Sequence, residues 1–201
     1  MKPRRDHVPA AATGLAALLA AAATAWPDPW IYERSLVLGG QGWRIFTAHA
    51  VHFGPLHLWT NLAVVLPAVY LGAREDGRTL ALVLAASATA VGAGLFAFDP
   101  ALARFGGLSG VACALVAWTG LRWCATARRR TAGVSLLAVL AAKLMLFDSR
   151  TTDTATLPAD IVPLAAAHWI GAAAGGAVFI LRYFREERLS PRPTTLRRDR
   201  S

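Results

Sequence analysis

Four polar residues lie within long apolar stretches of this chain, and together they could carry out the chemistry of a serine hydrolase. A hydroxyl and an imidazole can act as a nucleophile and its general base. A second imidazole and an amide can donate hydrogen bonds to an oxyanion that develops during acyl transfer. Because polar side chains inside a bilayer are costly, they mark functional sites. The four residues are His57, Asn61, Ser109 and His168.

The composition predicts a membrane protein. Apolar residues make up 55% of the 201 residues and charged residues only 16%, against about 25% in soluble proteins. At roughly 20 residues per spanning helix, the length has room for about six. We therefore predict an all-α membrane protein, a bundle of six transmembrane helices. The apolar segments cover residues 10–26, 55–71, 79–98, 106–123, 132–147 and 161–183.

The first apolar segment has two interpretations. It follows the basic residues Lys2, Arg4 and Arg5 and ends near Ala23-Thr24-Ala25, which is typical of a secretory signal and its cleavage site. The apolar run is longer than the about 7–15 residues usual in such signals, which favours a retained helix. Both interpretations place the residues that follow outside the cytoplasm.

The distribution of basic residues predicts the orientation. With a cytoplasmic N-terminus, the cytoplasmic pieces carry sixteen lysines and arginines and the outer pieces carry four, as the positive-inside rule requires. We expect a cytoplasmic N-terminus at residues 1–9, a helical domain at 10–184 with an outer loop at 27–54, and a basic cytoplasmic tail at 185–201. The basic patches are short and lack interleaved aromatic residues, which argues against nucleic acid as a partner.

This topology places the four polar residues in the outer half of the membrane. The helices at 55–71, 106–123 and 161–183 all run inward. His57 and Asn61 are four residues apart near the start of their helix and share one face. Ser109 lies near the start of the helix at 106–123. His168 lies about seven residues, or about 10 Å, into the helix at 161–183. The alternative is that they only form hydrogen bonds and close contacts that hold the bundle together.

Glycines surround the two candidate catalytic residues. Gly107 and Gly110 flank Ser109 and permit unusual dihedral angles and close backbone approach. Gly171 and Gly175 follow His168 with a spacing that is typical of close helix packing. This packing would bring the last helix against the helix of Ser109. Since no carboxylate lies near His168 in the membrane, we predict a Ser-His dyad and not a triad.

The two cysteines, Cys113 and Cys124, lie in one predicted helix. Eleven residues separate them by about 16 Å along its axis, whereas a disulfide needs Cα atoms within about 7 Å. We expect both to be small packing residues. We expect neither a metal ion nor another cofactor.

These motifs, in this order, resemble the rhomboid family of intramembrane serine proteases over about residues 10–184. The resemblance implies that Ser109 is the nucleophile, that His168 is the general base, and that the Ser109 backbone N–H completes an oxyanion hole. It implies a multi-pass protein of the bacterial inner membrane whose site opens to the periplasm and cleaves membrane-anchored proteins near the outer face. The motifs are Trp43-Arg44, the run His52 to Asn61 with His57, Gly107-Leu108-Ser109-Gly110, and Ala167-His168 with Gly171 and Gly175.

The resemblance also assigns supporting roles. His52 would buttress the outer loop, and Trp43 and Arg44 would anchor it; His57 and Asn61 would donate to the oxyanion. One position departs from the family, because many members carry a tyrosine four residues after the serine that packs on the catalytic histidine. Here that position is Cys113, so the orientation of His168 needs another explanation.

A narrower resemblance is to the rhombosortase subfamily. It is carried by the short length, by Tyr32-Glu33-Arg34 ahead of Gly42-Trp43-Arg44, and by Lys143. It implies a substrate with a C-terminal Gly-Gly sorting signal, followed by a membrane helix and a basic end. The partners expected are this anchored protein and the lipid bilayer.

Three alternatives remain at this stage. The chain could be a general rhomboid protease of other substrates, or a catalytically inactive rhomboid that binds membrane helices. It could also be a small transporter or scaffold. A transporter would show charged residues deep in several helices or an inverted repeat, and the sequence shows neither.

Overall fold

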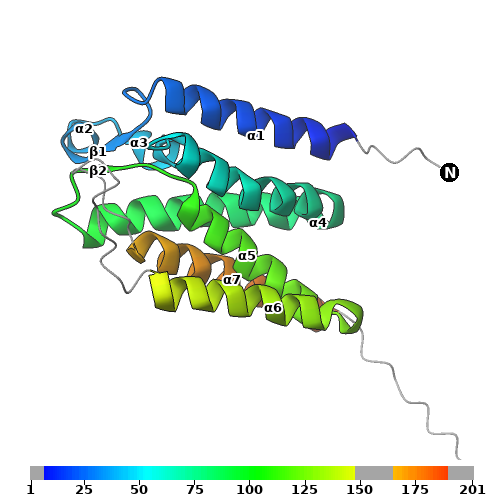
Figure 1. Ribbon diagram of the computed structural model, residues 1–201. Helices are drawn as coiled ribbons and strands as arrows, with labels where there is room; N and C mark the ends of the chain where they lie inside the picture. The colour runs from blue at the N-terminus through cyan, green and yellow to red at the C-terminus, as the bar shows by residue number, and fades with distance from the viewer. Residues whose placement is uncertain (1–6, 148–164, 190–201) are drawn as a thin grey trace, which may run out of the picture.

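Long helices packed side by side form most of the computed structural model, which describes residues 7–147 and 165–189 (Figure 1). Short helices and a pair of two-residue strands lie together at one end. The long helices are α1 (His7–Ala25), α4 (Pro55–Phe98), α5 (Ser109–Cys124), α6 (Arg130–Ala142) and α7 (Ala165–Leu189).

Helix α4 consists of two limbs joined at Asp76. This residue has non-helical dihedral angles (φ −156°, ψ 79°), and its carboxylate accepts a hydrogen bond from the Thr79 backbone N–H at 3.0 Å. Asp76 therefore caps the start of the second limb, as aspartate does at helix N-termini. The limbs correspond to the segments predicted at 55–71 and 79–98, but the connection between them is helical on both sides of one break.

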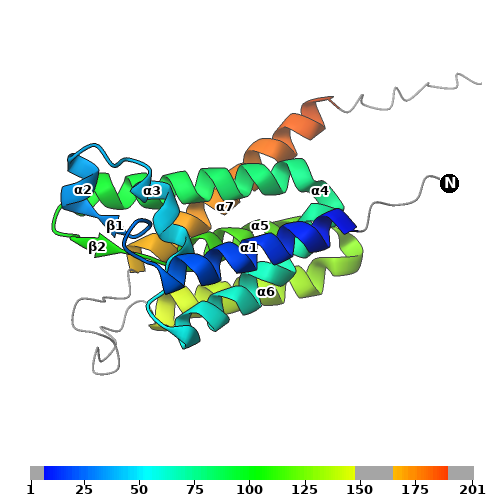
Figure 2. The same ribbon diagram turned by 90° about the horizontal axis from the view of Figure 1, so that it is seen from above.

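Helix α5 lies at the centre and packs against α4, α6 and α7. The side chains of Leu115 and Trp118 are almost fully buried in a core that includes Val83 of the second α4 limb and Val178 of α7. Helix α1 packs outside this core, against α4 (Figure 2) and the short 3-10 turn η1 (Ala48–Ala50). The helix that begins at Ser109 is thus held on several sides.

The outer connection at 27–54 is folded. It contains β1 (Tyr32–Glu33), α2 (Arg34–Leu38), α3 (Arg44–Thr47) and the 3-10 turn η1 (Ala48–Ala50). Strand β1 pairs antiparallel with β2 (Arg104–Phe105), which lies just ahead of α5. The aromatic side chains paired in this register, Tyr32 and Phe105, are both buried. The connection is therefore fixed to the segment that leads into Ser109.

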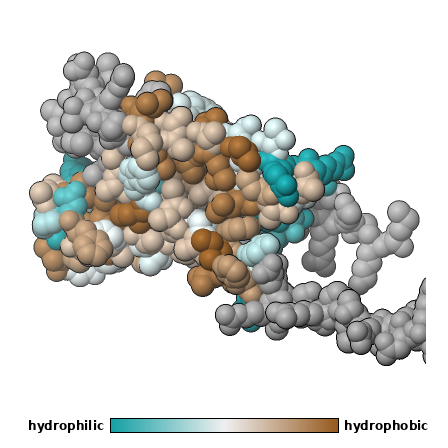
Figure 3. Space-filling view, turned by 90° about the horizontal axis from the view of Figure 1, so that it is seen from below, coloured by the Kyte–Doolittle hydropathy of each residue, from teal (hydrophilic) through white to brown (hydrophobic). Residues whose placement is uncertain are grey.

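Two of the described helices are long and apolar enough to cross a membrane, namely α4 and the part of α7 at Ala165–Arg185. Helices α5 and α6 have 16 and 13 residues, fewer than the about 20 that a straight span needs. Large apolar side chains are exposed on the bundle, among them Val134, Val139, Ile180 and Leu181. Apolar side chains dominate the middle of the face in Figure 3. That six helices cross the membrane remains a prediction.

Several predicted boundaries change. The segment predicted at 132–147 is regular only to Ala142 and continues as a π-helix, η3 (Lys143–Phe147), and the turn η2 (Ala127–Arg129) precedes it. Helix α7 continues to Leu189, so it extends beyond residue 184 into the segment predicted as the basic tail, and the domain boundary itself stays a prediction. The predicted start of the last segment at 161, and the remainder of the tail, lie outside the described residues.

Candidate active site

The turn ahead of Ser109 depends on a glycine. Gly107 has φ +134°, which L side chains rarely adopt. A Cβ at this position would lie 3.0 Å from Cε1 and 3.2 Å from Nε2 of His57. The Gly107 N–H donates to the Ala48 carbonyl at 3.0 Å. Ser109 is the first residue of α5, so this turn sets the position of its hydroxyl beside the His57 ring.

His57 and Asn61 present hydrogen-bond donors from one face of α4. The Phe53 backbone N–H donates to Nδ1 of His57 at 3.4 Å, so Nδ1 carries no hydrogen and Nε2 does. Asn61 is buried and donates from Nδ2 to the His57 carbonyl at 2.9 Å. The amide group has a second N–H hydrogen to donate. Each residue of the predicted pair therefore has an N–H group that can donate, and Nε2–H of His57 lies against the Ser109 turn.

Helices α5 and α7 touch through glycines. A Cβ on Gly171 would lie 1.9 Å from the Gly110 carbonyl oxygen, and one on Gly175 would lie 2.1 Å from that of Ala114. A Cβ on Gly110 would lie 2.7 Å from the Ala167 carbonyl oxygen. No larger residue fits these positions. The close packing predicted from the spacing of the two α7 glycines is present.

This contact brings the candidate nucleophile and base onto adjoining helices. Gly110 follows Ser109 in α5, and Ala167 precedes His168 in α7. His168 is buried and is the fourth described residue of α7. His57 is close enough to His168 for an electrostatic interaction. Nδ1 of His168 lies 2.9 Å from Nζ of Lys143.

His49 belongs to the same region, although the sequence motifs do not single it out. It is buried, and its Nε2 lies 2.9 Å from the Ala88 carbonyl while its Nδ1 lies 3.4 Å from that of Gly107. Its ring thus lies between the Ser109 turn and the second limb of α4. The signal that could have found it is the spacing of three histidines, at 49, 52 and 57, within nine residues.

His52 packs inside the outer connection. Its Nδ1 lies 3.1 Å from the Ala50 carbonyl and 3.5 Å from Thr24 Oγ1 of α1, and its ring stands edge-on to His57 with centroids 5.0 Å apart. Burial, and to a lesser extent electrostatic repulsion between the His52 and His57 rings, lowers the pKa of His52 from 6.5 to about 4. Burial also lowers the pKa of His49. Both rings are therefore neutral at pH 7.

These lowered pKa values predict acid sensitivity of the outer connection. The folded protein binds fewer protons at His49 and His52 than the unfolded chain does, so stability rises with pH. The contribution of the two neutral rings to the free energy of unfolding is complete above the ordinary histidine pKa of 6.5. It is lost as the pH falls below 6.5, for His52 toward about 4. We expect the thermal midpoint in detergent to fall over this range, and to fall less in His52→Gln. Equal losses in the two proteins would contradict the assignment to His52.

Arg44 and Trp43 differ in their surroundings. The Arg44 side chain is buried and donates from Nη1 to the carbonyls of Asp28 and Ile31 at 2.7 and 2.8 Å, and from Nε to Gln41 Oε1 at 2.7 Å. Trp43 is 54% exposed. The guanidinium therefore supplies the contacts that fold the connection back on itself, while the indole lies at the surface.

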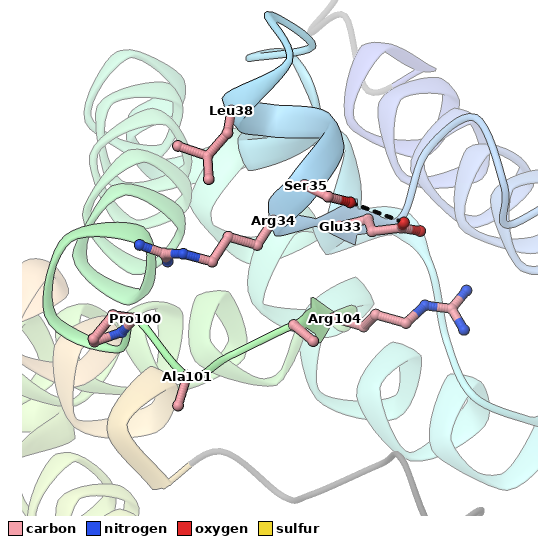
Figure 4. Close-up of a pocket in the computed structure, with 8 residues that line it drawn as sticks. Glu33, Arg34, Ser35, Leu38, Pro100, Ala101 and Arg104 are labelled. Carbon is pink, nitrogen blue, oxygen red and sulfur yellow. Dashed lines mark hydrogen bonds between the residues drawn. The ribbon is translucent and has the colours of Figure 1, made fainter.

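A surface pocket lies apart from these residues, between α2 and the segment that leads into β2 (Figure 4). Its walls include Glu33, Arg34 and Arg104, and Ser35 donates to Glu33 within it at 3.1 Å. The Arg34 guanidinium donates a hydrogen bond from Nη1 to the Phe96 carbonyl at 2.9 Å. The pocket contains none of the predicted catalytic residues.

Comparison with known families gives a match over most of the chain. The model of the Rhomboid domain matches residues 39–185, which include every candidate site residue named above. No protein of curated function matches the chain significantly. Members of the matched family are intramembrane serine proteases that act on membrane-embedded protein substrates.

Proposed function

Because this chain belongs to the rhomboid family of intramembrane serine proteases, we propose that it is a serine endopeptidase in which Ser109 and His168 form the catalytic dyad. The protein is an integral membrane protein. The observation that carries the proposal is the contact of α5 with α7 at Gly110, Ala167 and Gly171. It joins the two helices at the residues next to the hydroxyl and the imidazole.

In the proposed reaction, Ser109 Oγ attacks a peptide carbonyl of the substrate while His168 takes its proton. His168 then returns the proton to the leaving amine, and an acyl-enzyme on Ser109 remains. Water or another nucleophile releases the product, with His168 again accepting and returning a proton. Covalent catalysis of this kind divides one difficult step into two easier ones.

The oxyanion that forms on the carbonyl requires hydrogen-bond donors. We assign them to Nε2–H of His57, to the Asn61 amide and to the Ser109 backbone N–H. The tautomer of His57 supports this assignment, because Phe53 occupies Nδ1 and leaves the hydrogen on Nε2 beside the Ser109 turn. Donors of this kind are worth about 3–4 kcal/mol each.

The charge distribution supports an orientation with the site at the outer membrane face. Glu75 lies at the break in α4 and forms ion pairs with Arg122 at 3.4 Å and with Arg129. Glu75 lies where the first limb of α4 ends, whereas His57 lies near its start, and Arg122 lies in the last turn of α5, whereas Ser109 begins that helix. Basic residues favour the cytoplasmic side, so the candidate site faces the periplasm if this is a bacterial inner-membrane protein with cytoplasmic termini.

We further propose that the substrate carries a C-terminal Gly-Gly sorting signal, as in the rhombosortase subfamily. A peptide bond in a helix is shielded by its own hydrogen bonds and must be unwound before attack. Glycine lowers the helix stability by about 1 kcal/mol per residue. A glycine pair at the outer end of a membrane helix therefore lowers the free energy needed to unwind the helix before cleavage.

A fluorophosphonate that reacts with activated serines tests the assignment of the nucleophile. We expect the purified full-length protein in detergent to be labelled once, on the peptide that contains Ser109, as measured by mass spectrometry. The matched control is Ser87→Ala, which removes a buried serine of α4 whose hydroxyl bonds only within its own helix in the described structure. It should leave labelling unchanged. Labelling elsewhere, or none, would refute the proposed dyad.

A further inference from the structure

A lysine contacts the candidate general base. Nζ of Lys143 lies 2.9 Å from Nδ1 of His168, within hydrogen-bond distance, and the Lys143 side chain is half-buried. The mechanism proposed above uses only one ring nitrogen of His168, the one that takes the Ser109 proton. The other nitrogen has a partner that the dyad does not account for.

The fold places this lysine through a local change of helix type. Helix α6 is regular to Ala142, and the π-helix η3 begins at Lys143. Single π-turns of this kind are rare and are frequent at functional sites. The side chains on either side, Leu140 and Leu144, are buried against Cys113 of α5. These contacts fix η3 against the core on both sides of Lys143.

Cys113 contributes by its size. It is 3% exposed and packs with Leu140, Leu144 and the half-buried Ala172 of α7, which lies one turn beyond His168. A bulky side chain at this position would occupy the space between α5, η3 and α7. With a cysteine there, the start of η3 lies close enough to α7 for Lys143 to reach the imidazole.

The chemistry of a general base fixes which way the hydrogen bond must run. For Nε2 to accept the Ser109 proton, the neutral imidazole must carry its hydrogen on Nδ1. Nδ1–H then donates to its partner, and the partner must accept. A lysine accepts only as the neutral amine, because an ammonium has no lone pair.

On the basis of the proposed Ser-His dyad, we propose that Lys143 is a positioning residue whose Nζ accepts a hydrogen bond from His168 Nδ1–H and so fixes the ring and its tautomer. The Ser109 proton moves to Nε2, and Nδ1–H stays bonded to Nζ. The imidazolium that forms is stabilised because its hydrogen bond becomes charge-assisted. Nε2 then gives the proton to the leaving amine.

Two substitutions of Lys143 test this assignment through the rate of fluorophosphonate labelling. Lys143→Met keeps the length and removes the amine, and we expect labelling of Ser109 to slow about tenfold or more. Lys143→Arg introduces a guanidinium that can only donate, which would force the hydrogen onto Nε2, so we expect a loss of about 100-fold or more. Leu146→Met, at a 58% exposed position of the same η3 segment, is the matched control and should stay within about twofold.

The nitrogen chemical shifts of ¹⁵N-labelled histidine give a second reading that needs no variant. We expect the wild-type His168 signals to report the Nδ1–H tautomer, and Lys143→Arg to report Nε2–H. A wild-type ring with its hydrogen on Nε2 overturns the proposal, as does an unchanged or faster rate in Lys143→Met, or full activity in Lys143→Arg. If Ser109 is not labelled in the wild-type protein, the dyad fails, while the tautomer still decides the role of Lys143.

Discussion

Replacing Ser109 by alanine is expected to lower the cleavage of a membrane-anchored Gly-Gly reporter by about 10⁴-fold or more, because removing a nucleophile abolishes the covalent route. The reporter carries a soluble domain, the glycine pair, one membrane helix and a basic end. Release of the domain is measured in cells that produce either enzyme, and mass spectrometry of its new C-terminus locates the cut. His168→Ala should lose a similar factor, and the two losses should not add, since both residues act in one step.

Two controls separate catalysis from assembly and from substrate choice. Ser87→Ala makes the same chemical change at a fully buried serine in α4 and should cleave normally. A reporter with Leu-Leu in place of Gly-Gly should be cut more slowly if the glycine pair eases unwinding. Unchanged release by Ser109→Ala would disprove the nucleophile, whereas equal cutting of the two reporters would disprove only the Gly-Gly specificity.

The second large effect is expected at the contact between α5 and α7. In Gly171→Ala the new Cβ would lie 1.9 Å from the Gly110 carbonyl oxygen, so the two helices must separate. Overpacking of this kind costs about 1–3 kcal/mol or more, and the separation carries His168 away from Ser109. We expect a lower thermal midpoint and a large loss of fluorophosphonate labelling, with Gly175→Ala behaving in the same way.

The matched control is Gly176→Ala on the same helix. Its Cβ would meet only Leu121 Cδ1, at an ordinary 3.8 Å. Because alanine favours helix by about 1 kcal/mol over glycine, this variant should be as stable as the wild-type protein or more so. If Gly171→Ala kept both its midpoint and its labelling, the close contact would not be what positions the dyad.

Features set by neighbouring residues along one helix could be predicted from the sequence. The shared face of His57 and Asn61 follows from a spacing of four residues, and the packing of Gly171 and Gly175 follows from another. The change of direction between the second and third apolar segments is marked by polar residues, and Asp76 provides the cap there. Local geometry decides all three.

Features that join distant parts of the chain could not be predicted from the sequence. His49 lies beside the carbonyls of Gly107 and Ala88, residues far from it in sequence. In the sequence, Lys143 supports only the resemblance to a subfamily, because nothing in the spacing of residues 143 and 168 indicates that their side chains meet. The π-turn that carries Lys143 was also hidden, since residues 132–147 have the composition of a regular helix.

The order of the helices in the chain has a consequence for biosynthesis. The proposed oxyanion donors are in α4, the nucleophile begins α5, and the base is in α7, the last helix described. A nascent chain that has inserted its earlier helices carries the serine without its base. The proposed proteolytic activity therefore requires that α7 has been synthesised and has packed against α5.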